Sequence, residues 1–111
     1  MNIYVAGPYQ IGDKEQNVKN TIDAAEHLSQ HGFIPIVPLL SHYWHIHYHH
    51  PHEFWMTIDY VLLSICDIMV FLPGKSKGVE QEVQWANAMN IPVIPYDKEN
   101  VIFHIHQLLS L

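Results

Sequence analysis

Hydrophobic positions along the chain follow two alternating patterns. Four short runs, rich in β-branched residues, are typical of buried strands: Ile3–Ala6, Phe33–Val37, Ile68–Leu72 and Pro92–Ile94. Four longer segments carry apolar residues at every third or fourth position, which predicts helices over Asp13–His31, Pro51–Ile65, Gly78–Asn90 and Val101–Leu109. The residues from His42 to Pro51 follow neither period, and we expect a loop there.

The alternation of strand and helix predicts an α/β fold. Strands joined through helices pair in parallel, so we expect a three-layer, flavodoxin-like or Rossmann-like sheet of about four to five strands with helices on both faces. Pro35 removes a backbone donor from the second strand, which favours an edge position for that strand. A length of 111 residues is near that of a common domain, and we expect residues 1–111 to form a single one.

Two glycine-containing loops follow predicted strands at the edge of the sheet where ligands bind. In parallel sheets of this kind, ligands lie at the carboxyl ends of the strands. The first strand ends in Gly7-Pro8-Tyr9, and the third is followed by a loop that contains Ser76 and Gly78. Glycine and serine there allow backbone amides to approach a phosphate or a sugar hydroxyl, with a helix N-terminus behind them. We therefore expect these five residues to contact a substrate.

One acidic residue falls on the apolar side of the helix that follows this loop. At 100° per residue, Glu82 lies in the same stripe as Val79 and Ala86, whereas Glu80 falls on the opposite, solvent side. Burying a carboxylate costs free energy, so the position calls for a compensating role. One interpretation is a nucleophile or general base in a partly dry pocket. The other is a structural carboxylate that caps the backbone or pairs with Lys75.

Asp59 repeats this pattern on the preceding helix. It shares a stripe with Trp55, Leu62 and Cys66, and taken alone it slightly favours a structural carboxylate that accepts hydrogen bonds from a loop. Two inward acids on helices that flank the same strand favour catalysis instead. Paired carboxylates break glycosidic bonds, one attacking or steadying the anomeric carbon while the other manages protons.

Two tyrosines flank the turn after the first strand. Tyr4 precedes the turn and Tyr9 follows it. A phenol near Glu82 would donate a hydrogen bond and orient its carboxylate. The more common alternative is a tyrosine that merely packs in a half-buried strand.

A histidine-rich segment separates the second strand from the next helix. Its histidines are His42, His45, His47, His49, His50 and His52, interleaved with aromatic residues. We expect an aromatic, polar lid that stacks on a flat ligand, with His42 and Trp44 among the residues that contact it. Spacings of two to three residues also suit zinc, and Glu53 offers an oxygen, so a metal site is the less favoured alternative. We expect neither a metal nor another cofactor.

Composition narrows the class of partner. The formal net charge is −6, with five lysines and no arginine. A basic face for phosphates cannot be assembled from these residues, so we exclude nucleic acid and expect a small molecule. No run approaches the roughly 20 apolar residues of a membrane span, so we expect no membrane partner. The single cysteine, Cys66, is compatible with a reducing compartment, and we expect a cytoplasmic protein.

Together these motifs resemble the nucleoside 2-deoxyribosyltransferase superfamily, including its nucleotide N-glycosidase relatives and small uncharacterised members. The resemblance covers nearly the whole chain, from Ile3-Tyr4-Val5-Ala6-Gly7-Pro8-Tyr9 to Ile91-Pro92-Val93. Its most specific part is Ser76-x-Gly78-x-x-x-Glu82-x-x-x-Ala86.

The resemblance implies a role for each of these residues. Glu82 would be a nucleophile that attacks C1′ of the sugar, displaces the base and leaves a glycosyl-enzyme for water or a second base. Asp59 would assist the departing base, and Tyr4 would orient the nucleophile. Ser76 and Gly78 would hold the 5′ end of a nucleotide. The partner would be a nucleoside or nucleotide, and the protein would form a homodimer or a higher homo-oligomer.

Two segments differ from the superfamily pattern. The apolar segment Gln107–Leu111 stands where deoxyribosyltransferases carry a carboxylate, and the first loop, Tyr9–Gly12, lacks the arginine of the nucleotide hydrolases. The sequence therefore does not decide between base exchange and hydrolysis, or whether the substrate needs a 5′-phosphate. The alternatives from other classes are a nucleotide-binding module without turnover and a metal-binding protein that uses the histidine-rich segment.

Overall fold

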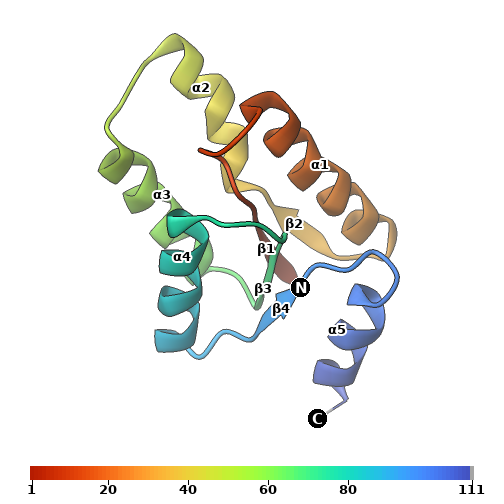
Figure 1. Cartoon of the computed structure of the whole chain (residues 1–111). Helices are drawn as coiled ribbons and strands as arrows, with labels where there is room; N and C mark the ends of the chain where they lie inside the picture. The colour runs from red at the N-terminus through yellow and green to blue at the C-terminus, as the bar shows by residue number, and fades with distance from the viewer. Residues whose placement is uncertain (111) are drawn as a thin grey trace.

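The computed structural model describes residues 1–110, in which strands and helices alternate along the chain (Figure 1). The strands are β1 (Asn2–Ala6), β2 (Ile34–Ile36), β3 (Ile68–Phe71) and β4 (Val93–Pro95). The helices are α1 (Lys14–Gln30), α2 (Ser41–His47), α3 (His52–Ser64), α4 (Lys77–Ala88) and α5 (Val101–Leu109), and a short 3₁₀ turn, η1 (Pro38–Leu40), precedes α2. Leu111, the end of the apolar C-terminal segment, lies outside the described residues. Within residues 1–110, every helix is too short or too polar to cross a membrane.

Within the described residues, the four strands form one parallel sheet in the order β2-β1-β3-β4. Strand β1 pairs with β2 on one side and with β3 on the other, so that Tyr4 lies between Ile36 and Met69. The strand order reverses between β1 and β3, and open α/β sheets bind ligands at this switch point. The parallel sheet and the edge position of the second strand, both predicted from the sequence, are confirmed.

Helices cover both faces of the sheet, with α1 and α5 on one side and α3 and α4 on the other (Figure 1). Successive residues of a strand point to opposite faces, so β1 contributes to both layers. Ile3 and Val5 pack beneath α1 and α5, whereas Tyr4 and Ala6 pack beneath α3 and α4. The fully buried Tyr4 ring is thereby placed under the helix that carries Glu82.

The residues from His42 to Pro51, predicted as a loop, contain most of helix α2, so this prediction was wrong. The helix packs against the rest of the protein along a narrow face, and His42 is its buried residue. Its larger side chains, Tyr43, Trp44 and Ile46, all remain about half exposed. A helix of this kind has no apolar stripe, so the period that revealed the other helices is missing here.

Two glycines hold the loops at the C-terminal edge of the sheet in place. A Cβ on Gly7 would lie 2.6 Å from Cγ2 of Thr21, so only glycine allows α1 to approach the end of β1 this closely. Gly74 has a φ of +124°, and a Cβ there would lie 2.9 Å from Cγ of Pro8. The loops after β1 and β3 therefore lie against each other beside the switch point.

Candidate active site

A cavity of about 510 Å³ opens at the C-terminal edge of β1 and β3. Its volume falls in the range of small-molecule sites, roughly 300–1,000 Å³. The walls come from the loop after β1, from α2 and the residues that follow it, from α3, and from the start of α4. The lining residues with polar or aromatic groups include Tyr9, His42, His45, His50, Trp55, Asp59, Lys75, Ser76, Lys77 and Glu82, together with the backbone of Gly7 and Gly78.

Glu82 faces this cavity from the inward side of α4 and is only 6% exposed. The Tyr4 hydroxyl donates a hydrogen bond to its Oε2 atom. Burial raises the pKa of the Glu82 carboxyl to about 8, against the opposing effect of the Tyr4 hydrogen bond and reinforced by repulsion from Asp59. Among residues 1–110, Glu82 forms no ion pair, so the structural alternative of a pair with Lys75 is not realised.

Tyr4 serves this carboxylate as a permanent hydrogen-bond donor. Burial, and then the negative charges of Glu82 and Asp59, raise the pKa of Tyr4 far above its ordinary range. The phenol therefore keeps its proton at neutral pH. Because Tyr4 lies in the central strand and pairs with residues on both sides, its hydroxyl is held rigidly.

Asp59 lines the same cavity from α3. Burial raises the pKa of its carboxyl to about 7. Two neighbouring carboxyls resist double ionisation and titrate as a pair, so at neutral pH the pair of Asp59 and Glu82 retains a proton. The arrangement can therefore offer a carboxylate and a carboxylic acid to the same bound molecule.

The raised pKa of Glu82 predicts how stability changes with pH. Its carboxyl binds a proton more tightly in the folded protein than in the unfolded chain, where the pKa is near 4.5. The stabilising effect of that proton is complete below pH 4.5 and is lost as the pH rises to about 8. We expect Glu82→Gln to remove this loss and to be about 1–2 kcal/mol more stable than the unmodified protein at pH 8.

Urea unfolding at a series of pH values between 4 and about 9 checks this expectation. Glu80→Gln is the matched control, because Glu80 lies two residues away on the solvent side of the same helix. It should follow the pH dependence of the unmodified protein. A Glu82→Gln protein with the same pH dependence as that control would contradict the prediction.

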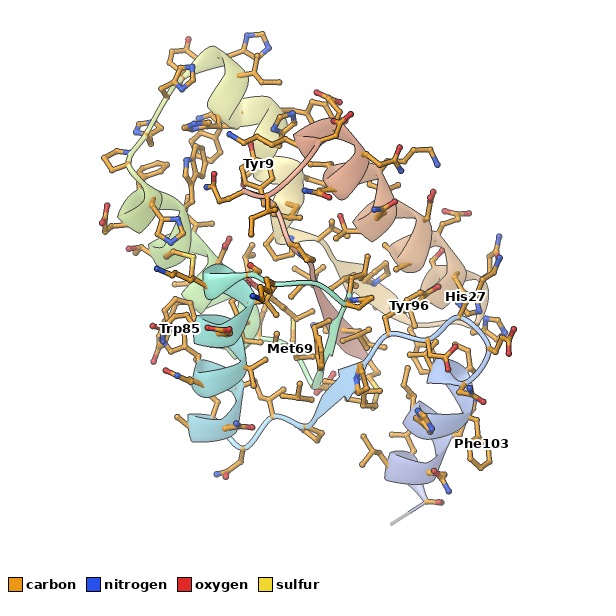
Figure 2. All side chains as sticks on the ribbon, viewed as in Figure 1. Tyr9, His27, Met69, Trp85, Tyr96 and Phe103 are labelled. Atoms are coloured by element: carbon orange, nitrogen blue, oxygen red, sulfur yellow. The ribbon has the colours of Figure 1, made fainter. Side chains whose placement is uncertain are left out.

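A second chain of polar groups crosses the wall formed by α2. The Tyr9 hydroxyl lies 2.6 Å from Nδ1 of His42, and Nε2 of His42 lies 2.9 Å from Oε1 of Glu15. The side-chain amide of Asn17 donates to the carbonyls of Tyr9 and Ile11, which fixes the loop after β1. Figure 2 shows Tyr9 at the end of this loop, beside α2. The sequence pattern did not reveal Glu15, because an exposed acid in the first turn of a helix is common.

Aromatic side chains from α2 and α3 make the other part of this wall. The Trp55 indole donates a hydrogen bond of 2.9 Å to Nδ1 of His45, and the ring of His50 stacks on Phe54 with centroids 3.8 Å apart. The histidine-rich segment was expected to form an aromatic, polar lid that stacks on a flat ligand. In the structure it forms a packed cluster of rings that presents His45, His50 and Trp55 to the cavity.

Two of the expected substrate-contacting residues lie outside the cavity. His42 and His45 are three residues apart on α2 and therefore share the face that lines it. Trp44 points away from that face and packs edge-on against Trp55, with ring centroids 5.1 Å apart. Pro8 is turned towards Gly74 rather than towards the cavity.

The N-terminus of α4 forms a polar end of the cavity. The Ser76 side chain caps the helix by accepting a hydrogen bond of 3.1 Å from the backbone N–H of Val79, and its carbonyl accepts one from Glu80. The N–H groups of Lys77 and Gly78 have no partner among residues 1–110. With the side chains of Lys75 and Lys77 also lining the cavity, this end suits an anion or a polar group.

The described part of the chain contains no group of three histidine, cysteine, aspartate or glutamate side chains that could hold a metal ion. His45 is instead hydrogen-bonded to His49 and to the Trp55 indole. The metal-binding alternative therefore gains no support from these residues.

Comparison with known proteins yields a family and a shared fold. Residues 1–96 match the family described as "Domain of unknown function (DUF7768)". No curated protein matches the chain significantly. Among solved structures, a 2-deoxyribosyltransferase from the psychrotolerant bacterium Bacillus psychrosaccharolyticus is similar, with a TM-score of 0.57 and 16% identity over 86% of this chain and 71% of that one. At this identity the similarity shows that the two proteins share a fold.

Proposed function

The chain belongs to the DUF7768 family, and we propose that it cleaves the N-glycosidic bond of a nucleoside or nucleoside 5′-monophosphate through a glycosyl-enzyme on Glu82. The observation that carries this proposal is the pair of carboxyls, Glu82 and Asp59, that line one cavity with raised pKa values. The fold shared with a 2-deoxyribosyltransferase, described as a biocatalyst for nucleoside synthesis, supports the substrate class.

The reactive form of the pair is the one in which Asp59 carries the retained proton and Glu82 is ionised. Because Glu82 has the higher pKa, this is the minor form in the free protein at neutral pH. In the first step, the ionised Glu82 carboxylate attacks C1′ of the sugar. A bond forms between C1′ and a Glu82 oxygen while the bond from C1′ to the base nitrogen breaks, and its electron pair leaves with the base. Asp59 gives its proton to that base, so the base departs neutral. Because Tyr4 binds Oε2, the Oε1 atom is left for the attack.

The second step releases the sugar from Glu82. The Asp59 carboxylate takes a proton from a water molecule, whose oxygen attacks C1′ and restores the Glu82 carboxylate. A second base in place of water gives base exchange by the same steps. Hydrolysis and transfer thus differ in the acceptor that enters the cavity and use the same three side chains.

The cavity has ends of different character, which suit the two ends of a nucleotide. The flat faces of Trp55 and His50 suit a base, because aromatic rings stack favourably on one another. The free N–H groups of Lys77 and Gly78, with the Ser76 hydroxyl and the two lysines, suit the 5′ end of the sugar or its phosphate. Glu82 and Asp59 then act on the bond that lies between.

A panel of nucleosides and 5′-monophosphates tests the proposed function. Each compound is incubated with the protein, with and without a free acceptor base, and the products are separated by chromatography. We expect at least one compound to release its base. Release in water alone indicates a hydrolase, whereas release that needs the acceptor indicates a transferase. Tight nucleotide binding in calorimetry without any release over hours would favour the binding-module alternative.

A further inference from the structure

The hydrogen bonds around His42 determine which of its nitrogens carries a proton. The Glu15 side chain is 64% exposed, and an exposed carboxylate accepts hydrogen bonds but cannot donate them. Its Oε1 lies 2.9 Å from Nε2 of His42, so Nε2 carries the proton. In the neutral imidazole, Nδ1 is then a pure acceptor. The opposite tautomer would place two lone pairs against each other at Glu15.

The same reasoning extends to Tyr9. Its hydroxyl lies 2.6 Å from Nδ1 of His42, which is a short O–H hydrogen bond. Because Nδ1 is an acceptor, Tyr9 donates its only proton to His42. Burial, together with the charge of Glu15, raises the pKa of Tyr9, so the phenol keeps this proton. Its oxygen is left with lone pairs only, at the wall of the cavity that Tyr9 and His42 both line.

Tyr9 belongs to the part of the cavity that suits a base. Its ring packs edge-on against His42, with centroids 5.5 Å apart, on the wall that also presents His45 and Trp55. The anion-binding end at the start of α4 is formed by other segments. Tyr9 and the aromatic wall are therefore both available to the same bound base.

We propose that Tyr9 selects substrates whose base presents an exocyclic amino group to it, and disfavours bases with a carbonyl oxygen in the same place. The inference rests on the proposed function for its substrate class, within which it favours adenine and cytosine over hypoxanthine and uracil. A carbonyl there would meet another acceptor and lose its hydrogen bond to water without a replacement. Glu15 and His42 are positioning residues, because they act by fixing the direction of the Tyr9 proton.

The test measures binding, so that it does not depend on turnover. Glu82→Gln protein is titrated calorimetrically with adenosine, inosine, cytidine and uridine at pH 8, where the histidine side chain is ordinarily neutral. We expect each amino nucleoside to bind about tenfold or more tightly than its oxo counterpart. Unmodified protein titrated with free adenine and hypoxanthine should show the same order, which separates the result from any effect of the Glu82 substitution.

Glu15→Gln tests the chain of hydrogen bonds that runs from Glu15 through His42 to Tyr9. A glutamine amide offers His42 either an acceptor or a donor, so the tautomer is no longer fixed and Tyr9 is free to donate to a carbonyl. We expect the preference for amino bases to fall to about twofold or less in this variant and in Tyr9→Phe. Glu26→Gln, an equal change of charge at an exposed position of the same helix, should retain it.

Three outcomes would overturn the inference: equal binding of amino and oxo nucleosides, a preference that survives both Glu15→Gln and Tyr9→Phe, or no binding of any of the four nucleosides. Failure of the proposed function has a different signature. In that case the amino preference is present in binding and depends on Glu15, but the unmodified protein releases no base from any nucleoside.

Discussion

Glu82→Gln will slow the release of base by a factor on the order of 10⁴ or more. The amide has nearly the same size as the carboxylate, so it fits the buried side of α4, which also carries Val79 and Ala86, while it removes the nucleophile. Without a nucleophile the covalent step disappears, and only slow attack by water on the bound substrate remains. The measurement is kcat for the best substrate of the nucleoside panel.

Glu80→Gln is the control for this variant, since it makes the same change two residues earlier on the exposed side of α4. It should retain activity within about twofold. Acid quenching of the unmodified protein during turnover, followed by mass spectrometry, should show the added mass of one sugar on the peptide containing Glu82. A Glu82→Gln protein that releases base within tenfold of the normal rate would remove the nucleophile from the mechanism.

Asp59→Asn will lower kcat by about 10² to 10⁴, and the size of the loss will depend on the base that leaves. Asparagine has no acidic proton to give, so the base must depart as an anion. The negative charge that develops on the base then raises the activation free energy. A purine nucleoside methylated at N7 carries a cationic base that departs neutral and needs no proton. With such a substrate we expect Asp59→Asn to cost less than tenfold.

The measurement is kcat of the unmodified protein and of Asp59→Asn with guanosine and with 7-methylguanosine, or with the corresponding pair for the preferred purine. Asp23→Asn is a suitable control, because Asp23 lies on the exposed side of α1 and, within residues 1–110, pairs only with Lys19 at the surface. An equal loss with both substrates in Asp59→Asn would show that Asp59 has a role other than protonating the base.

The periodicity of apolar residues predicted most of this fold, because long helices with one buried face and the two central strands, buried on both faces, leave clear patterns. It also predicted the orientation of Glu82. The helical phase placed Glu82 inward and Glu80 outward, and their exposures in the structure agree. Tyr4 was predicted as a possible partner of that carboxylate, and the structure contains the hydrogen bond between them.

The aromatic wall of the cavity, formed by α2 and α3, was less predictable, for physical reasons. Helix α2 is stabilised by contacts among exposed rings rather than by an apolar stripe, so its sequence lacks the helical period of apolar residues. Without that period, the outward direction of Trp44 could not be predicted either. The bonds from His42 to Tyr9 and Glu15 span 33 and 27 residues. Contacts of this range depend on how the helices pack, and spacing within a single segment does not encode them.

The contact between Tyr4 and Glu82 joins residues 78 positions apart and has a consequence for the order in which the chain folds. Strand β1 pairs on one side with β2, which pairs Asn2 with Ile34, and on the other side with β3, which pairs Ile3 with the more distant Ile68. Pairings over such long stretches of chain form slowly, because the loop between them must first be closed. In a partly folded chain in which β1 has not yet paired with β3, Tyr4 is not held in place as the donor for Glu82. The hydrogen bond between Tyr4 and Glu82 therefore depends on the long-range pairing of β1 with β3, and a chain without that pairing has no assembled cavity.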